Sequence, residues 1–223
     1  MERAGVVGHP IAHSKSPRIH GYWLKKDGIA GEYQAYDVHP HQLRDEALRL
    51  RDAGLAGFNV TLPHKQAIMD VCTTLNDEAT RIGAVNTVVF HPGGEIEGRN
   101  TDAFGFMTNA IEAHPDFDWR QNPAVVIGAG GAARAILYAL KRAGVPEIRL
   151  TNRTIDTAGA LAEEFGCRVH DWDERSAAVQ GAGVAINTTS LGMTGQPSLE
   201  IDLHGMASDA LVYDIVYAPL QTP

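Results

Sequence analysis

The residues from Asn59 to Lys65 have the types and spacing needed for proton transfer. They join a predicted strand at 57–60 to a helix expected to begin at Pro63, so Lys65 would lie in the first turn. There the helix dipole disfavours a positive charge and, with partial desolvation, would lower the lysine pKa toward a useful range. Asn59 and Thr61 alternate along the strand, so two hydroxyl-binding groups would lie beside the amine. Lys65 is therefore a candidate acid–base group; the alternative is a solvated surface lysine.

Two serines in an earlier loop form a candidate anion site. Ser14 and Ser16 lie just ahead of Pro17, and Ser16 with Pro17 is a good N-cap and first-turn pair. Free amides and the dipole at such a helix end attract an anion, for example a substrate carboxylate. The loop is equally compatible with Ser16 serving only as the helix cap.

Further polar residues end the first half of the chain. Asn86 is expected to follow a strand, and Asp102 directly precedes an apolar-periodic helix that contains Phe106 and Ile111. An acid can orient an ammonium group and tune its proton affinity, which makes Asp102 a candidate partner for Lys65. Asp102 could instead be a simple N-cap, and sequence spacing does not decide whether the two side chains meet.

A glycine-rich turn in the second half has the order of a dinucleotide-binding site. The β-branched run 125–127 enters the turn and an apolar-periodic helix leaves it. Gly128 permits the sharp turn, Gly130 lets amides approach a pyrophosphate, and Ala133 is small enough for helix and strand to pack. We favour this interpretation over a plain strand-to-helix turn because both flanks fit. The predicted ligand residues are Gly128, Ala129, Gly130, Gly131, Ala132 and Ala133.

The end of the next strand indicates which nucleotide binds. An NAD-specific fold offers an acidic residue to the ribose at this point, whereas this chain has Thr-Asn-Arg-Thr at 151–154. No acid repels a 2′-phosphate there, and Arg153 can pair with it while stacking on the adenine. The pattern therefore favours NADP over NAD, with Asn152, Arg153 and Thr154 as ligands. Thr154 also suits the N-cap of the following helix.

Alternating strands and helices position these groups. In the first half we expect strands and helices in turn near 4–7, 17 onward, 33–38, 43–53, 57–60 and 63 onward. After residue 127, strands are expected near 148–151, 167–170, 184–187 and 211–215. The predicted fold is α/β, with an N-terminal open α/β substrate domain at 1–102 and a C-terminal Rossmann-type NADP-binding domain at 103–223.

Composition excludes several classes of function. The 223 residues are 44% hydrophobic and 21% charged, as in ordinary globular proteins, and suffice for two domains. A net charge of −8 argues against a nucleic-acid partner. No apolar run approaches the roughly 18 residues of a membrane span, and the N-terminus lacks a signal-peptide pattern, so a cytoplasmic location is expected.

Cysteine and histidine usage predicts neither a disulfide nor a metal site. Cys72 and Cys167 are the two cysteines, far apart and without metal-type spacing, so buried thiols are expected. His9 with His13, and His39 with His41, are interrupted by prolines and lack an obvious completing ligand. We therefore expect structural or surface histidines there.

Five blocks of this chain resemble, in order and spacing, those of the shikimate dehydrogenase family. They are His-Ser-Lys-Ser-Pro at 13–17, Asn-Val-Thr-Leu-Pro-His-Lys at 59–65, Gly-Ala-Val-Asn-Thr at 83–87, Asn-Thr-Asp at 100–102 and Gly-Ala-Gly-Gly-Ala-Ala at 128–133. The likeness covers essentially the whole chain, and the lysine block is far more specific than the glycine loop. It implies reversible NADP-linked interconversion of 3-dehydroshikimate and shikimate by a monomer or homodimer.

The resemblance also implies roles for single residues. Lys65 and Asp102 become the catalytic pair, and Gly21 departs from the usual asparagine without affecting that pair. The implied substrate ligands are Ser14 and Ser16 for a carboxylate, Asn59, Thr61, Asn86 and Asp102 on the hydroxyl side, and Tyr217 nearby. The residues implied beside the nicotinamide half are Thr188, Ser190 and Met193, although Met193 could equally be a core residue.

The chain ends earlier than members of the family, and two other functions are compatible with its motifs. Members of the family continue with a helix, a strand and closing helices that include a substrate-binding glutamine, so we expect the sequence to lack this C-terminal segment. One alternative is a quinate/shikimate dehydrogenase, which an acid at the ribose end would favour; that acid is absent here. The other is a catalytically silent NADP-binding module, in which Lys65 and Asp102 would be superfluous.

Overall fold

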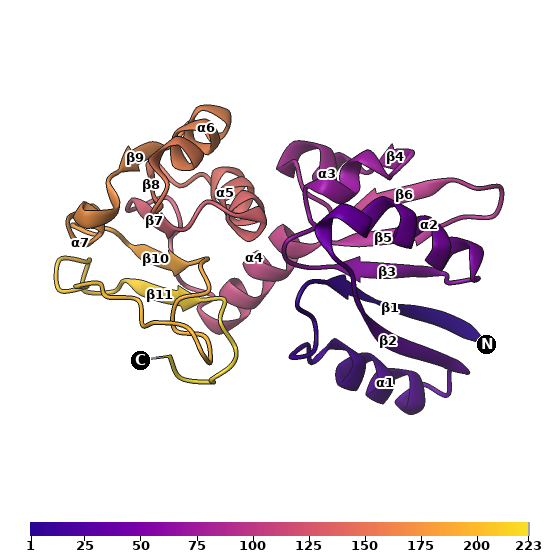
Figure 1. Cartoon of the computed structure of the whole chain (residues 1–223). Coiled ribbons are helices and arrows are strands. Elements are labelled where there is room, and N and C mark those ends of the chain that lie inside the picture. Colours follow the sequence, from indigo (N-terminus) through magenta and orange to yellow (C-terminus); the bar gives the residue numbers. More distant parts are fainter. Residues whose placement is uncertain (223) are drawn as a thin grey trace. The chain divides into compact units, whose positions relative to one another are not determined.

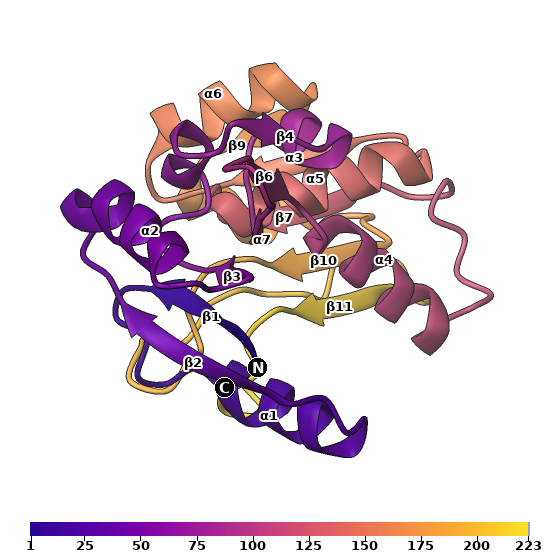
Figure 2. The same ribbon diagram turned by 90° about the vertical axis from the view of Figure 1, so that its right-hand side faces the viewer.

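The chain folds into two compact units, each built around one β-sheet (Figures 1 and 2). The first unit ends at Thr101 and the second begins at Asp102, so the division falls one residue before the expected boundary. The computed structural model describes residues 1–222. Both units alternate strands with helices, which confirms the predicted α/β class. None of the helices in these residues is long and apolar enough to cross a membrane.

The first unit contains a mixed six-stranded sheet in the order β2-β1-β3-β5-β6-β4. β1 pairs in parallel with β2 and β3, whereas β5 is antiparallel to both β3 and β6. The strands are β1 (Glu2–Gly8), β2 (Gly31–Asp37), β3 (Gly57–Val60), β4 (Thr74–Leu75), β5 (Thr87–Phe90) and β6 (Ile96–Arg99). The first three were predicted, and the others were missed. Gly93 and Gly94, both with positive φ, lie between β5 and β6 and are the kind of turn signal that indicates a hairpin.

Helices cover the two faces of this sheet differently. The main apolar core combines β1, β3 and β5 with α2 (Leu43–Asp52), α3 (Asp77–Ile82) and the 3₁₀ helix η2 (Ala67–Asp70). α1 (Ser16–Lys26) contacts β1 and β2, and a short 3₁₀ helix, η1 (Pro40–Gln42), precedes α2. Because side chains alternate along β3, Phe58 and Val60 enter the core while Asn59 faces the other side.

The helix expected from Pro63 does not form. Residues 62–66 make turns, and only the short η2 follows them. The Lys65 carbonyl accepts a hydrogen bond from the Val85 amide at 2.7 Å. In a helix this carbonyl would instead accept from an amide four residues later in the same segment. The buried His64 side chain is likewise bound 2.7 Å from the Val38 carbonyl. The helix-dipole argument for Lys65 is therefore wrong.

The predicted cap of α1 is also wrong. The helix begins at Ser16 itself, so Lys15 occupies the N-cap position and makes no side-chain capping bond. The Ser14 hydroxyl instead accepts a hydrogen bond from the Ser16 amide at 3.3 Å. Pro17 lies in the first turn, where its missing N–H costs no helical bond.

The second unit has a parallel five-stranded sheet in the order β11-β10-β7-β8-β9, which confirms the five predicted strands. They are β7 (Ala124–Ile127), β8 (Ile148–Thr151), β9 (Arg168–His170), β10 (Val184–Asn187) and β11 (Leu211–Asp214). The strand order reverses at β7, so β7 and β10 define the switch point of a doubly wound sheet. Ligands of such sheets bind beside the carboxyl ends of the strands at this point.

Helices lie on both faces of this second sheet. On one side α5 (Gly131–Ala143) packs against both α4 (Asp102–Ala113) and α6 (Ile155–Phe165). A separate apolar cluster, built from β7, β10, α7 (Arg175–Ala178), the 3₁₀ helix η3 (Trp172–Glu174) and part of the segment 199–206, covers the other side. The helix expected after Thr154 forms as α6, which is the crossover between β8 and β9.

The cysteines and the histidine pairs have ordinary surroundings. Cys72 and Cys167 are half-buried free thiols, and burial raises the pKa of each to about 11. His9 Nδ1 lies 2.6 Å from Asp37 Oδ1, so an acid that sequence spacing did not reveal contacts this ring. Within residues 1–222, no group of three or more histidine, cysteine, aspartate and glutamate side chains forms a candidate metal site.

Candidate active site

Three loops of the first unit are hydrogen-bonded together at the carboxyl ends of β1 and β3. The His9 amide donates to the Leu62 carbonyl at 2.9 Å, and the Val85 amide donates to the Lys65 carbonyl at 2.7 Å. These bonds hold the loop after β1, the turn after β3 and the segment before β5 side by side. Along these loops lie Ser14 and Ser16, then Thr61 and Lys65, then Asn86.

Asn86 directly precedes β5, and the prediction that it follows a strand is wrong. The β-branched run after it forms the strand, and the Asn86 amide donates to the Arg99 carbonyl at 3.0 Å. Asn86 Oδ1 accepts from the Thr101 amide at 3.1 Å and from the Thr87 hydroxyl at 2.9 Å. Asn86 Nδ2 donates to Thr101 Oγ1 at 2.9 Å, so backbone and side chains both fix this amide.

Asn59 is held by partners that the sequence did not reveal. The Tyr33 hydroxyl donates to Asn59 Oδ1 at 2.6 Å, and Asn59 Nδ2 donates to Thr87 Oγ1 at 3.0 Å. Tyr33 lies on β2, and β1 separates that strand from β3. Strand alternation assigns a face to Tyr33 but cannot identify a polar partner two strands away.

Lys65 and Asp102 belong to different units. Lys65 is half-buried in the turn after β3. Asp102 is the first residue of α4, where the helix dipole stabilises its negative charge, and it is not the residue before the helix as predicted. The pairing of these two side chains stays a prediction.

Gly128 packs the glycine turn against the end of β10. Its φ is +106°, and a Cβ built there would lie 2.6 Å from Thr188 Oγ1 and 2.9 Å from Thr189 Cγ2. The Thr188 amide and hydroxyl each donate to the Ile127 carbonyl at 2.8 Å. The carboxyl ends of β7 and β10 are thus joined at the switch point, and only glycine fits between them.

The start of α5 is open to an anion. Gly130 is the N-cap and provides no side-chain capping bond. A Cβ on Gly130 would find no atom within 4 Å among the described residues, whereas Ala133 is completely buried where the helix packs. The first amides of a helix without a side-chain cap are a suitable partner for phosphate oxygens, so this turn fits a pyrophosphate.

Replacing Gly128 by alanine is expected to lower the free energy of unfolding by about 1–3 kcal/mol, because the new Cβ is both crowded and forced to a positive φ. The matched variant Gly130→Ala has a negative φ of −89° and free space, so only the weaker N-capping of alanine should lower its stability, by about 0.5–1 kcal/mol. Urea denaturation followed by circular dichroism measures both changes. Equal stability of the two variants would contradict the packing described for Gly128.

The turn after β8 carries the residues predicted to select the nucleotide. Asn152 Nδ2 donates to the Thr154 carbonyl at 3.0 Å and so shapes the turn. Arg153 is exposed, and within residues 1–222 no hydrogen bond or ion pair holds its guanidinium. Thr154 is the N-cap of α6, as predicted, but its hydroxyl makes no capping bond.

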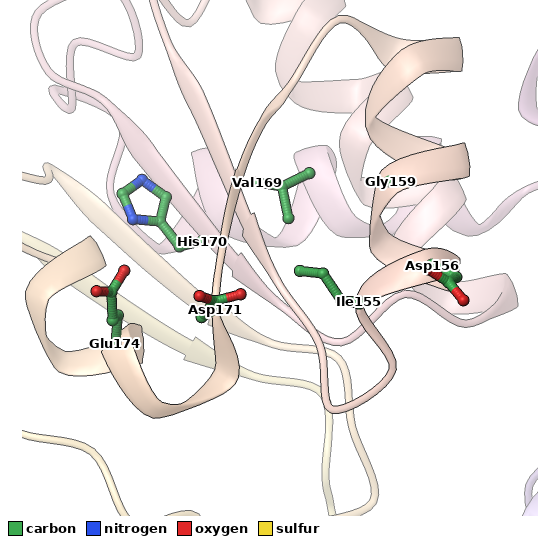
Figure 3. A pocket seen from close by; sticks show the side chains of 7 residues that line it. All are labelled: Ile155, Asp156, Gly159, Val169, His170, Asp171 and Glu174. Atoms are coloured by element: carbon green, nitrogen blue, oxygen red, sulfur yellow. The ribbon is translucent and has the colours of Figure 1, made fainter.

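A hollow next to this turn has an acidic lining (Figure 3). Its walls come from the first turns of α6, the end of β9 and η3, and they include Asp156, Asp171 and Glu174. Burial, aided by Arg168 and Arg149, lowers the pKa of His170 in the same lining, which favours a neutral ring. Three carboxylates repel a phosphate, so the hollow itself does not suit a 2′-phosphate, and Arg153 lies outside its lining.

The loop after β10 is shaped by Asn187, which sequence reasoning left without a role. This buried side chain accepts from the Thr189 amide at 3.0 Å and donates to the Leu191 carbonyl at 3.1 Å. Its amide also donates to Asp214 Oδ1 at 3.1 Å and so joins the loop to β11. Three predicted ligand residues lie in or next to this loop: Thr188 is buried, and Ser190 and Met193 are half-buried. Tyr217, the fourth predicted residue in this part of the chain, follows β11 and is exposed.

Sheet order, the switch-point turn and the open start of α5 together define a dinucleotide-binding α/β protein. The comparisons agree: the family model "Shikimate dehydrogenase substrate binding domain" matches residues 6–88, and "Shikimate / quinate 5-dehydrogenase" matches residues 111–194. The chain belongs to the shikimate dehydrogenase family, whose members are oxidoreductases.

Individual relatives match nearly the whole chain. It is 48% identical to the shikimate dehydrogenase (NADP(+)) of Ruegeria sp. (strain TM1040) and 50% identical to that of Paramagnetospirillum magneticum. Each alignment covers 98% of this chain and 80% of the relative. The crystal structure of the Thermus thermophilus enzyme in complex with NADP(H) and shikimate has a TM-score of 0.85 and 37% identity, over 98% of this chain and 80% of that one.

Proposed function

We propose that this protein catalyses the reversible NADP-dependent reduction of 3-dehydroshikimate to shikimate, a step in aromatic amino-acid biosynthesis. The observation that carries the proposal is the joining of the Ser14, Thr61, Lys65 and Asn86 segments at one edge of the first sheet. High identity to enzymes named for this reaction supports the same conclusion. In this proposal residues 1–102 form the substrate domain and residues 103–223 the NADP-binding domain.

The substrate would be held through groups at its two sides. Ser14 and Ser16, at the start of α1, bind the carboxylate, because hydroxyl groups and the amides of a first helical turn suit an anion. Asn59, Thr61 and Asn86 bind the ring hydroxyls through amide and hydroxyl groups. The anchored side chain of Asn86 supports this role because it needs no reordering when a ligand arrives. Tyr217 is proposed as a further substrate contact.

Lys65 and Asp102 form the proposed proton-transfer pair. In the oxidation direction, neutral Lys65 accepts the proton of the reacting hydroxyl while the carbon–hydrogen bond breaks; in reduction, the ammonium returns that proton to the oxygen. Asp102 orients the ammonium and stabilises its charge. NADP, when bound, supplies the hydride acceptor and its reduced form the donor.

The second unit provides the proposed nucleotide site. The turn 128–133 and the start of α5 bind the pyrophosphate, and Asn152, Arg153 and Thr154 bind the 2′-phosphate side. Thr188, Ser190 and Met193 lie on the nicotinamide side of the switch point in this proposal. The fit of a pyrophosphate to the open N-terminus of α5, and the exposed guanidinium of Arg153, support these assignments.

The proposal includes only small-molecule ligands. A net charge of −8 gives no general attraction for nucleic acid. We further propose a cytoplasmic location. We also propose that the protein is a monomer or a homodimer, and sedimentation of the purified protein tests this oligomeric state.

Absorbance at 340 nm tests the reaction. The purified protein is expected to oxidise NADPH with 3-dehydroshikimate, and to reduce NADP⁺ with shikimate at higher kcat/KM than with quinate. The panel distinguishes a quinate-preferring enzyme from a shikimate enzyme. Binding of NADPH without turnover of either substrate would refute the proposal and favour a silent nucleotide-binding module.

A further inference from the structure

A row of polar side chains crosses the face of the first sheet that lies opposite the main core. Successive hydrogen bonds of 2.6, 3.0, 2.9 and 2.9 Å join its members. The members, in order, are Tyr33, Asn59, Thr87, Asn86 and Thr101. All five belong to the first unit, so the row is complete within one folded body.

A backbone amide fixes the direction of every bond in the row. The Thr101 N–H can only donate, so the atom of Asn86 that it contacts at 3.1 Å must be the carbonyl oxygen. The Thr87 hydroxyl, 2.9 Å from the same oxygen, must then donate to it. Thr87 Oγ1 therefore accepts from Asn59 Nδ2, and the remaining Asn59 oxygen faces Tyr33, whose hydroxyl must donate.

The Tyr33 side chain is well placed to act as a fixed donor. Its ring is stacked on that of His20 from α1, with centroids 4.0 Å apart and planes inclined by 5°. Trp23 contacts the same histidine edge-on at 5.2 Å. Burial raises the pKa of Tyr33, so its hydroxyl stays protonated and able to donate.

This order determines what Asn59 offers to a ligand. Its oxygen already accepts from Tyr33, and one of its N–H groups is used by Thr87. Asn59 Nδ2 also lies 3.5 Å from the backbone carbonyl oxygen of Asn86. This is a long contact, so a ligand oxygen can replace it as the partner of the second N–H at little cost. If the side-chain amide of Asn59 were turned by 180°, its oxygen would face the ligand. That oxygen would then accept a hydrogen bond from the substrate hydroxyl and compete with Lys65 for the hydroxyl proton.

We propose that Tyr33 is a positioning residue, which holds Asn59 so that its N–H donates to a substrate hydroxyl and leaves that hydroxyl's proton for Lys65. This inference rests on the proposed roles of Asn59 and Lys65. In this arrangement, Asn59 recognises a ring hydroxyl of the substrate as the acceptor of its hydrogen bond.

The variant Tyr33→Phe keeps the ring and the stacking on His20 but removes the donor. We expect the KM for shikimate to rise about fivefold to tenfold, which corresponds to the loss of one hydrogen bond, with the KM for NADP⁺ within about twofold. Tyr36→Phe is the matched control, because Tyr36 lies on the same strand but packs against the main core. It should leave both constants unchanged.

A double-mutant cycle tests whether Tyr33 acts through Asn59. In an Asn59→Ala background, Tyr33→Phe should raise the KM for shikimate by less than about twofold, because its partner is already gone. Independent, multiplicative losses, or an unchanged KM in Tyr33→Phe alone, would overturn the inference. Absence of shikimate turnover in the parent protein would instead refute the proposed function.

A second pair of variants covers the case in which Tyr33→Phe does not fold. Thr87→Ser retains a hydroxyl that donates to Asn86 and accepts from Asn59, whereas Thr87→Val removes it. We expect Thr87→Ser to retain the parent KM for shikimate and Thr87→Val to raise it about fivefold or more, with the KM for NADP⁺ constant. Equal KM values for the two variants would overturn the directional row.

Discussion

Replacing Lys65 by alanine is expected to lower kcat by about 10²- to 10⁴-fold, the usual contribution of a positioned acid–base group. Oxidation of an alcohol must release a hydroxyl proton as the hydride leaves, and reduction must supply one. Among the proposed substrate residues only Lys65 carries an amine. Because Lys65 is proposed to touch the substrate hydroxyl and not the nucleotide, Kd for NADPH should change by less than about twofold.

Stopped-flow absorbance under single-turnover conditions measures the chemical step for Lys65→Ala directly. Lys26→Ala, at the end of α1, is the matched control because it removes the same charge from an exposed position, and it should turn over normally. Added methylamine should restore part of the activity of Lys65→Ala, since a free amine can replace the lost acid–base group. Near-normal single-turnover hydride transfer in Lys65→Ala would contradict the assignment.

Replacing Arg153 by aspartate should reverse the cofactor preference. The change removes a charge-assisted contact to the 2′-phosphate and adds repulsion, while offering the ribose diol of NAD an acceptor. The ratio of kcat/KM for NADP⁺ to that for NAD⁺ should fall by about 10- to 10²-fold from the lost charged hydrogen bond, which contributes roughly 1.5–3 kcal/mol, and further through the added repulsion. Initial rates with shikimate and each cofactor give this ratio.

Arg168→Asp is a suitable control for the charge change, because the Arg168 side chain is 70% exposed and its ion pair with Glu147 spans 3.8 Å. It should leave the cofactor ratio within about twofold of the parent value. A ratio that Arg153→Asp leaves unchanged would remove Arg153 from the 2′-phosphate site.

Local sequence signals were sufficient where one segment determines its own structure. The turn at Gly128 follows a buried β-branched strand and precedes a periodic helix, and it forms as predicted with a positive φ. The strands around it were also predicted, because each is a short apolar run bounded by turn residues. The same reasoning could have found the hairpin of β5 and β6 from the glycine pair at 93 and 94.

The failures arose where distant segments compete for local hydrogen bonds. A lysine two residues after a proline resembles a helix start, but the Lys65 carbonyl bonds to Val85 in another segment. Asn86 was misplaced because the strand that follows it depends on pairing with residues 96–99. The contact between Tyr33 and Asn59 crosses an intervening strand, so no spacing rule could have revealed it.

Deuterium transfer from shikimate tests the central claim most directly. The protein is incubated with NADP⁺ and shikimate deuterated at C3, the carbon that bears the reacting hydroxyl, and the nucleotide is analysed by mass spectrometry. We predict NADPH that carries one deuterium on its nicotinamide ring, formed together with 3-dehydroshikimate. Unlabelled NADPH, or no NADPH in the presence of bound shikimate, would contradict the account.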